Sequence, residues 1–223
     1  MLWSAYNAKH LLPEIDSASQ AIFDQGHEVG ALAKKLFPNG IEIACDPDDF
    51  ERAILLTKEE FPLRRPIFEA TFSANGGYAR ADILNPVGQD EWDIIEVKST
   101  TRSKDVHLPD LAFQKWVFTA AGIKIRRCIL CHIKNEFVRQ GEVDPKTFFK
   151  LRSVTAAVAK VSARLGDQVH EMEKTICLTF TRGIGHKTKS LGGGRFFSGI
   201  PHPHLLGDCC PAPFTGVSNL STA

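Results

Sequence analysis

The sequence lacks any long apolar segment. Its apolar runs, such as Ala53 to Leu56 and Ile129 to Cys131, are far shorter than the roughly 18 residues that a membrane helix requires. Residues 1–9 do not show a basic segment followed by an apolar stretch, which is the pattern of a secretory leader. We therefore expect a cytoplasmic protein with no membrane partner.

A strong net charge and a rich supply of cysteine are also missing. The 27 Lys and Arg residues nearly balance the 26 Asp and Glu residues, and the net charge of +1 excludes a polybasic protein that coats nucleic acid. An anionic partner must then be bound by a local patch of the surface. Six cysteines among 223 residues are too few for a disulfide scaffold and fit reduced thiols.

Glycine and proline become frequent near the C-terminus, which divides the chain into two parts. We expect one domain over residues 1–175 and a poorly ordered tail over residues 176–223. The tail holds residues of the types that bind zinc, but their spacing differs from that of zinc fingers, so we predict no zinc site there. These residues are His202, His204, Cys209 and Cys210.

The pattern of apolar residues and turn signals predicts an α/β fold. Helix signals precede and follow a group of short segments that are rich in β-forming residues. The expected order is helix 17–37, helix 47–58, strands 67–72, 78–84 and 92–99, helix 108–121, strand 124–133 and helix 154–174. The first three strands are joined by short turns and should form an antiparallel meander.

Two turns in this meander determine which acidic side chains meet. If Asn75-Gly76 is a two-residue hairpin turn, counting back along both strands places Glu69 opposite Asp82. If residues 86–90 form the second loop, Glu96 becomes the diagonal neighbour of Asp82 on the same face of the sheet. The two turns together predict a patch of three carboxylates.

Three carboxylates in one patch repel one another and require a cation. Alternation along the third strand places Lys98 on the same face as Glu96, where it supplies part of the compensating charge. A divalent metal would supply the remainder, and oxygen ligands favour Mg²⁺ or Mn²⁺ over Zn²⁺. The alternative is a surface cluster of ion pairs, or a register shifted by one residue that scatters the acids over both faces.

The acidic motifs resemble those of the PD-(D/E)XK nuclease superfamily and its RecB-like branch, to which the CRISPR-associated four-cysteine exonucleases belong. The matching motifs are Glu69, Ala81-Asp82, Glu96-Val97-Lys98 and Gln114 in the helix that follows. The resemblance covers most of residues 14–175. The segments 16–40 and 110–141 are also similar to an uncharacterised bacterial subfamily, and the unusual ends of the chain favour a truncated member.

The resemblance implies a restriction-endonuclease-like core and a metal-dependent DNA nuclease that hydrolyses phosphodiester bonds. In such a site Asp82 and Glu96 hold Mg²⁺ or Mn²⁺. The main-chain carbonyl of Val97 assists them, and Glu69 is an additional candidate metal ligand. Lys98 orients or deprotonates the attacking water and stabilises the charged transition state. The implied activity is exonuclease-like, on single-stranded DNA or duplex ends, in DNA repair, recombination or phage defence.

Gln114 matches a helical motif of the RecB-like branch in which an aromatic residue follows four positions later. Here that residue is Phe118 where the family has Tyr, so a hydroxyl group is lost. Alternatively, Gln114 lies outside the active site and faces solvent on the helix. Basic side chains near the motifs are candidates for contacts with a phosphate backbone. They are Lys104, His107, Lys115, Arg126, Arg127 and Lys134.

The chain also departs from the family pattern. Many RecB-like enzymes carry a metal-binding His on the first helix, but Gly30 stands at that place, which leaves His27 as a further candidate ligand from a different face. An iron–sulfur cluster is not predicted, because no cysteine precedes Cys45. We expect Cys128 and Cys131 on opposite faces of one strand, as small core residues. Two other functions stay open: a catalytically silent nucleic-acid-binding or interaction module, and a structural domain with surface ion pairs.

Overall fold

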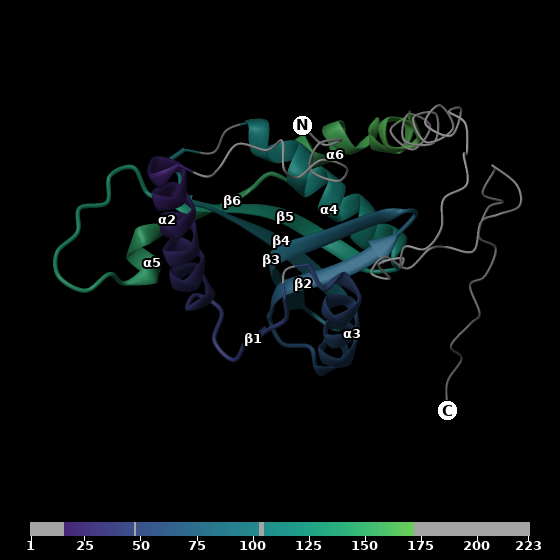
Figure 1. The fold of residues 1–223 in the computed structure, drawn as a ribbon, viewed down its shortest axis with the longest axis horizontal. Coiled ribbons are helices and arrows are strands. Elements are labelled where there is room, and N and C mark those ends of the chain that lie inside the picture. Colours follow the sequence, from purple (N-terminus) through teal and green to yellow (C-terminus); the bar gives the residue numbers. More distant parts are fainter. Residues whose placement is uncertain (1–15, 47, 103–104, 172–223) are drawn as a thin grey trace, which may run out of the picture. The chain divides into compact units, whose positions relative to one another are not determined.

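The computed structural model describes residues 16–46, 48–102 and 105–171 (Figure 1). The elements in chain order are α2 (Ser17–Lys34), β1 (Ile41–Glu42), α3 (Phe50–Glu60), η2 (Phe61–Leu63), β2 (Ile67–Ala74), β3 (Gly77–Val87), β4 (Glu91–Lys98), η3 (Asp105–His107), α4 (Leu108–Ala120), β5 (Lys124–Ile133), α5 (Pro145–Phe148), β6 (Phe149–Ser153) and α6 (Thr155–Ser162). The expected tail 176–223, with its histidines and cysteines, lies outside the described residues.

The strands form one mixed sheet in the order β1-β2-β3-β4-β5-β6. The strands β2, β3 and β4 are the antiparallel meander expected from the sequence. The strand β5 runs parallel to β4, because α4 carries the chain back across the sheet between them. The sequence analysis missed the short edge strands β1, parallel to β2, and β6, antiparallel to β5. The fold is therefore mixed α/β.

Helices cover both faces of this sheet and bury two apolar cores. On one face, Val117 of α4 and Val158 of α6 pack with strand residues such as Ile94. On the other face, Val29 and Ala33 of α2 pack with strand residues such as Ile95. We call these the α4 face and the α2 face. Among the described residues, no helix is both long and apolar enough to span a membrane.

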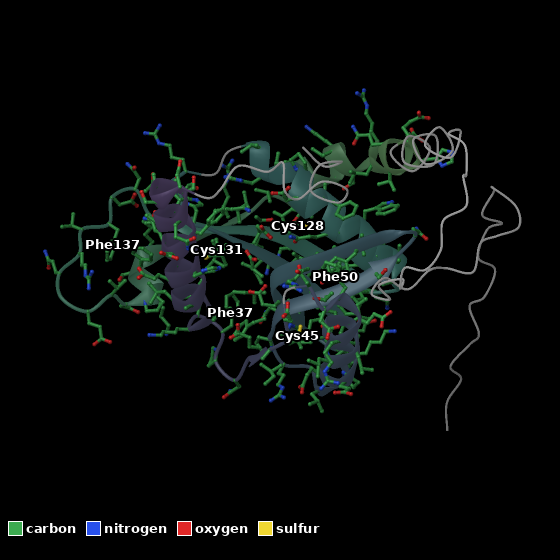
Figure 2. The ribbon with its side chains drawn as sticks, in the orientation of Figure 1. Phe37, Cys45, Phe50, Cys128, Cys131 and Phe137 are labelled. Carbon is green, nitrogen blue, oxygen red and sulfur yellow. The ribbon has the colours of Figure 1, made fainter. Side chains whose placement is uncertain are left out.

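The two cysteines of β5 lie in different cores, as the sequence predicts. Cys128 belongs to the core of the α4 face and Cys131 to that of the α2 face (Figure 2). Both are fully buried. Burial raises the pKa of the Cys128 thiol to about 11 and that of Cys131 to about 12, so both are uncharged at neutral pH. They act as small core residues.

The side chains of the β2–β3 hairpin exchange faces of the sheet between its base and its tip. Glu69 has a φ angle of +60°, which interrupts the alternation of side chains along β2. Phe68 lies in the core of the α2 face, whereas Ala70, two residues later, lies in that of the α4 face. The same reversal separates Ile83 from Ala81 on β3. The reversal is thus centred on Glu69 and on the residue opposite it.

The first turn of the meander has the predicted register. Ala74 pairs with Gly77, and the pairs on either side of Glu69 place it level with Asp82. The second predicted register is wrong by two residues, because Pro86 and Val87 extend β3 and shorten the loop. An even shift keeps each side chain of β4 on its expected face.

Candidate functional site

Asp82 lies where β3 separates from β4. The ladder between the two strands ends at the pair Ile83 and Ile95, so the next residues of β4 have no strand partner on this side. The Val97 amide N–H donates instead to Oδ2 of Asp82, at 2.7 Å. The corrected register also places Asp82 level with Glu96, closer than the diagonal arrangement expected from the sequence. The reversal of the hairpin at Glu69 therefore directs a carboxylate into a gap at the end of the sheet.

The gap also receives a backbone carbonyl. In a β-strand, the N–H and the C=O of one residue point toward the same neighbouring strand. Because the Val97 N–H is bound by Asp82, the Val97 carbonyl is directed toward β3 as well. A carboxylate oxygen and a main-chain oxygen thus flank one gap.

Glu96 is buried and held from two sides. Its side chain lies on the α4 face and is 6% exposed. Its Oε1 accepts a hydrogen bond from Lys98 Nζ at 2.8 Å, and its Oε2 accepts one from Gln114 Nε2 at 2.7 Å. The helix α4 presents Gln114 one turn after Asp110, whose Oδ2 lies 3.8 Å from Lys98 Nζ. Gln114 is therefore a buried residue of the site and does not face solvent.

Asp82 binds a proton more tightly than an ordinary aspartate does. Burial, followed by the negative charge of Glu96, raises the pKa of Asp82 to about 7. The hydrogen bond from Val97 and the charge of Lys98 oppose this shift without cancelling it. Negative charge at Asp82 is thus under-compensated by the side chains around it.

Lys98 is cationic at neutral pH. Burial lowers the pKa of Lys98, but the charge and hydrogen bond of Glu96, together with Asp82 and Asp110, raise it further, and the net shift is upward. A lysine in this state donates hydrogen bonds and does not accept a proton. Of the two roles expected from the resemblance, its geometry and charge favour orienting water over deprotonating it.

Glu69 is paired with a lysine that the sequence analysis did not single out. Its Oε1 lies 3.4 Å from Lys34 Nζ, which also bonds Glu42 at 2.7 Å. Glu69 adds to the negative potential at Asp82 but already has a cation beside it. His27 is exposed, and the described part of the chain shows no bond from it to the carboxylates. The helix α2 thus brings Lys34, two turns after His27, to the acidic cluster.

The donor set fits a hard divalent cation. In the ranges described, no three His, Cys, Asp or Glu side chains are grouped as a metal site, so the set is two carboxylates and the Val97 carbonyl. Mg²⁺ is commonly bound by one or two carboxylates and keeps several waters. The buried Gln114 Oε1 has no hydrogen-bond partner and can accept from such a water. The raised pKa of Asp82 is the change that a bound cation would reverse.

Three other residues of the expected site, Arg126, Arg127 and Phe118, have partners away from the carboxylates. Arg126 and Arg127 bind Asp93, which points to the α2 face, so the expectation that they follow a phosphate backbone across the carboxylates is wrong. Phe118 is fully buried and packs edge-on against Phe72 at 4.9 Å, in the core. Lys104 lies outside the described residues.

The comparisons with known proteins are sparse. No family model and no curated protein matches the chain. A solved crystal structure of the protein SSO0001 aligns with 63% of this chain and 86% of that one, at 15% identity and a TM-score of 0.26. A similarity this low carries no functional argument.

Proposed function

We propose that this protein is a Mg²⁺- or Mn²⁺-dependent nuclease that hydrolyses phosphodiester bonds in DNA. One observation carries the proposal: two carboxylates from adjacent strands, Asp82 and Glu96, meet beside Lys98, whose ammonium bonds Glu96 at 2.8 Å. The PD-(D/E)XK motifs supply the same residues in the same order. We propose exonuclease-like cleavage of DNA, and a cleavage assay that includes RNA tests this choice of polymer.

Each residue has a distinct role in the proposed reaction. Asp82, Glu96 and the Val97 carbonyl would hold the cation, which when bound polarises a phosphoryl oxygen and makes a bound water more acidic. Lys98 donates a hydrogen bond to the attacking water and stabilises the negative charge that develops on the phosphate. Gln114 holds Glu96 in one orientation through its amide N–H.

A cleavage assay with end-labelled single-stranded DNA, duplex DNA and RNA tests the proposal. We expect cleavage with Mg²⁺ or Mn²⁺ and none with a chelator. The double variant Asp82→Asn with Glu96→Gln should be inactive, and Glu136→Gln, an exposed acid in the loop between β5 and α5, should cut like the wild type. Cleavage that persists in the double variant would refute the assignment.

A second function is a catalytically silent module that binds nucleic acid or a protein. Two observations favour it: Phe118 is buried in the core and has no hydroxyl to replace that of the family's Tyr, and among the described residues no third acidic side chain is grouped with Asp82 and Glu96 as a metal site. It predicts that the wild-type chain binds the cation and DNA yet cuts neither DNA nor RNA with any divalent metal.

A further inference from the structure

A pocket lies on the α2 face, on the opposite side of β4 from the carboxylates. It has a volume of about 420 Å³, within the range of small-molecule sites. Two rows of paired strand residues form its floor. The first row is polar and consists of Asn85, Asp93 and Arg127; the second consists of Ile95, Ile129 and Ser153.

Asp93 of the polar row and its two partners, Arg126 and Arg127, form a trio with an excess positive charge. Asp93 is 3% exposed, and Arg126 binds both of its carboxylate oxygens, at 2.9 and 2.6 Å. Arg127 adds a single contact to Oδ2 at 3.2 Å. A bulge in the pairing of β4 with β5 brings these two consecutive arginines to one carboxylate. One arginine balances Asp93, so the trio keeps a net charge of +1.

Arg127 is the member of the trio that can bind a ligand. Its side chain is 48% exposed and lines the pocket. A guanidinium has five N–H donors in a planar fork that matches carboxylate and phosphate groups. A single contact to Asp93 orients this fork and leaves most of its donors for an anion.

The remaining walls fit an apolar body. Phe37, which follows α2, and Leu151 of the edge strand β6 line the pocket beside Ile95 and Ile129. Leu151 is 47% exposed although it is apolar. A planar ring placed against Leu151 and the half-buried Ile129 would bury this surface.

We propose that this pocket binds a small organic anion that has a planar apolar body and a phosphate or carboxylate head. The head binds Arg127, and the body lies between Phe37 and Leu151 against Ile129. Nucleoside monophosphates and aryl carboxylates share this chemistry. The site does not depend on the proposed nuclease activity, because the side chains of Asp93 and Ile95 point away from the face that carries Glu96.

Calorimetry with full-length protein in chelator tests the proposal. The probes are adenosine monophosphate, 2-naphthoate, inorganic phosphate and adenosine. We expect at least one of the two organic anions to bind tenfold or more tightly than phosphate or adenosine, and the tighter one identifies the head group. Binding of neither organic anion, or equal binding of phosphate alone, would overturn the proposal.

Variants separate binding from structure. Arg127→Ala should weaken the organic anion at least tenfold, Arg127→Lys by a smaller factor, and Arg139→Ala, an exposed arginine in the loop before α5, not at all. Ser153→Trp should block the pocket from the edge strand with little change in melting temperature. Arg126→Ala should lower the melting temperature more than Arg127→Ala, because it leaves Asp93 buried with one weak partner. Unchanged binding in Arg127→Ala would show that the trio is only structural.

Discussion

The exceptional residue in this chain is Asp82. A carboxylate that is partly buried normally obtains a cation or several hydrogen-bond donors. Asp82 has one backbone N–H, from Val97, and a neighbouring carboxylate that repels it. The nearest ammonium, that of Lys98, is bonded to Glu96. The site therefore favours either a proton or a metal ion at Asp82, and two predictions follow at this scale.

The pH dependence of stability should reveal the proton on Asp82. Because its pKa is raised from 3.8 to about 7 by folding, the folded state binds this proton more tightly than the unfolded state does. Without metal, the contribution of this group to the free energy of unfolding should fall as the pH rises from about 4 to about 7, by a few kcal/mol. Asp82→Asn should remove this decline, since an amide oxygen can still accept from Val97. Urea denaturation in chelator at pH 5 and pH 8 measures it, with Glu136→Gln as the control. An unchanged slope in Asp82→Asn would contradict the assignment.

Substitutions of Lys98 and Asp82 should differ in their effects on metal affinity and on the rate of cleavage. Lys98→Ala removes the cation that stabilises charge in the transition state, so cleavage should fall by a factor of 10² or more while metal affinity stays similar or rises. Asp82→Ala removes a ligand, so both metal binding and cleavage should be lost. Metal titration by calorimetry beside single-turnover cleavage measures both quantities. A Lys98→Ala protein that cuts at the wild-type rate would exclude the proposed role.

At the scale of elements, the site depends on the β2–β3 hairpin. A left-handed conformation at a residue other than glycine costs about 1–2 kcal/mol. Glu69 adopts it at the position where the hairpin reverses its faces, and the reversal carries β3 away from β4 just where Asp82 meets Val97. The strain at Glu69 is therefore part of what opens the gap for the carboxylates.

Substitution of Glu69 by glycine and by valine should reveal this strain. Both changes remove the carboxylate and its pair with Lys34, so their difference reports the backbone alone. We expect Glu69→Val to be less stable than Glu69→Gly by about 1–2 kcal/mol, because a β-branched residue tolerates a positive φ poorly. At Ser73, an exposed β2 residue with no such φ angle, valine should be the more stable of the two. Urea denaturation of the four variants measures both differences. The same order at both positions would argue against strain at Glu69.

The helices and strands that the sequence predicts are those whose ends are marked by nearby residues in the chain. Strand β5 has the predicted bounds, and α4 ends where Gly122 adopts a φ angle of +88°. The register of β4 was missed because Pro86 was interpreted as a loop residue, yet it pairs within β3 opposite Trp92. The predicted association of Glu96 and Lys98 with Asp82 still holds, because an even error in the second register keeps these β4 side chains on the same face. Lys34 could not be predicted, because it reaches Glu69 only through the packing of α2 on the sheet.

In the molecule as a whole, the strand β4 directs charged side chains to both faces of the sheet, and their charges are compensated differently on each face. The strand β4 presents Glu96 and Lys98 to the α4 face near its end, and Asp93 to the α2 face near its start. On the α2 face, two arginines compensate Asp93 fully. On the α4 face, Lys98 is shared between two acids, so the folded chain retains repulsion that a cation would relieve.

The last prediction is that Mn²⁺ or Mg²⁺ stabilises the whole chain. A ligand that binds only the folded state raises the free energy of unfolding by about 2.7 kcal/mol at 100 times its dissociation constant. For a domain of this size we expect a rise in melting temperature of roughly 5–10 °C. The rise should be smaller at pH 5 than at pH 8, because at pH 5 the cation must displace the proton on Asp82.

The double variant Asp82→Asn with Glu96→Gln supplies the control. It should melt at a higher temperature than the wild type in chelator at pH 8, since the repulsion is gone, and metal should not shift it further. Differential scanning calorimetry at both pH values, with and without metal, tests all of these differences in one set of measurements. If metal shifts the wild type and the double variant equally, the cation binds elsewhere on the chain. In that case the raised pKa of Asp82 reflects burial beside Glu96 without a metal-binding role.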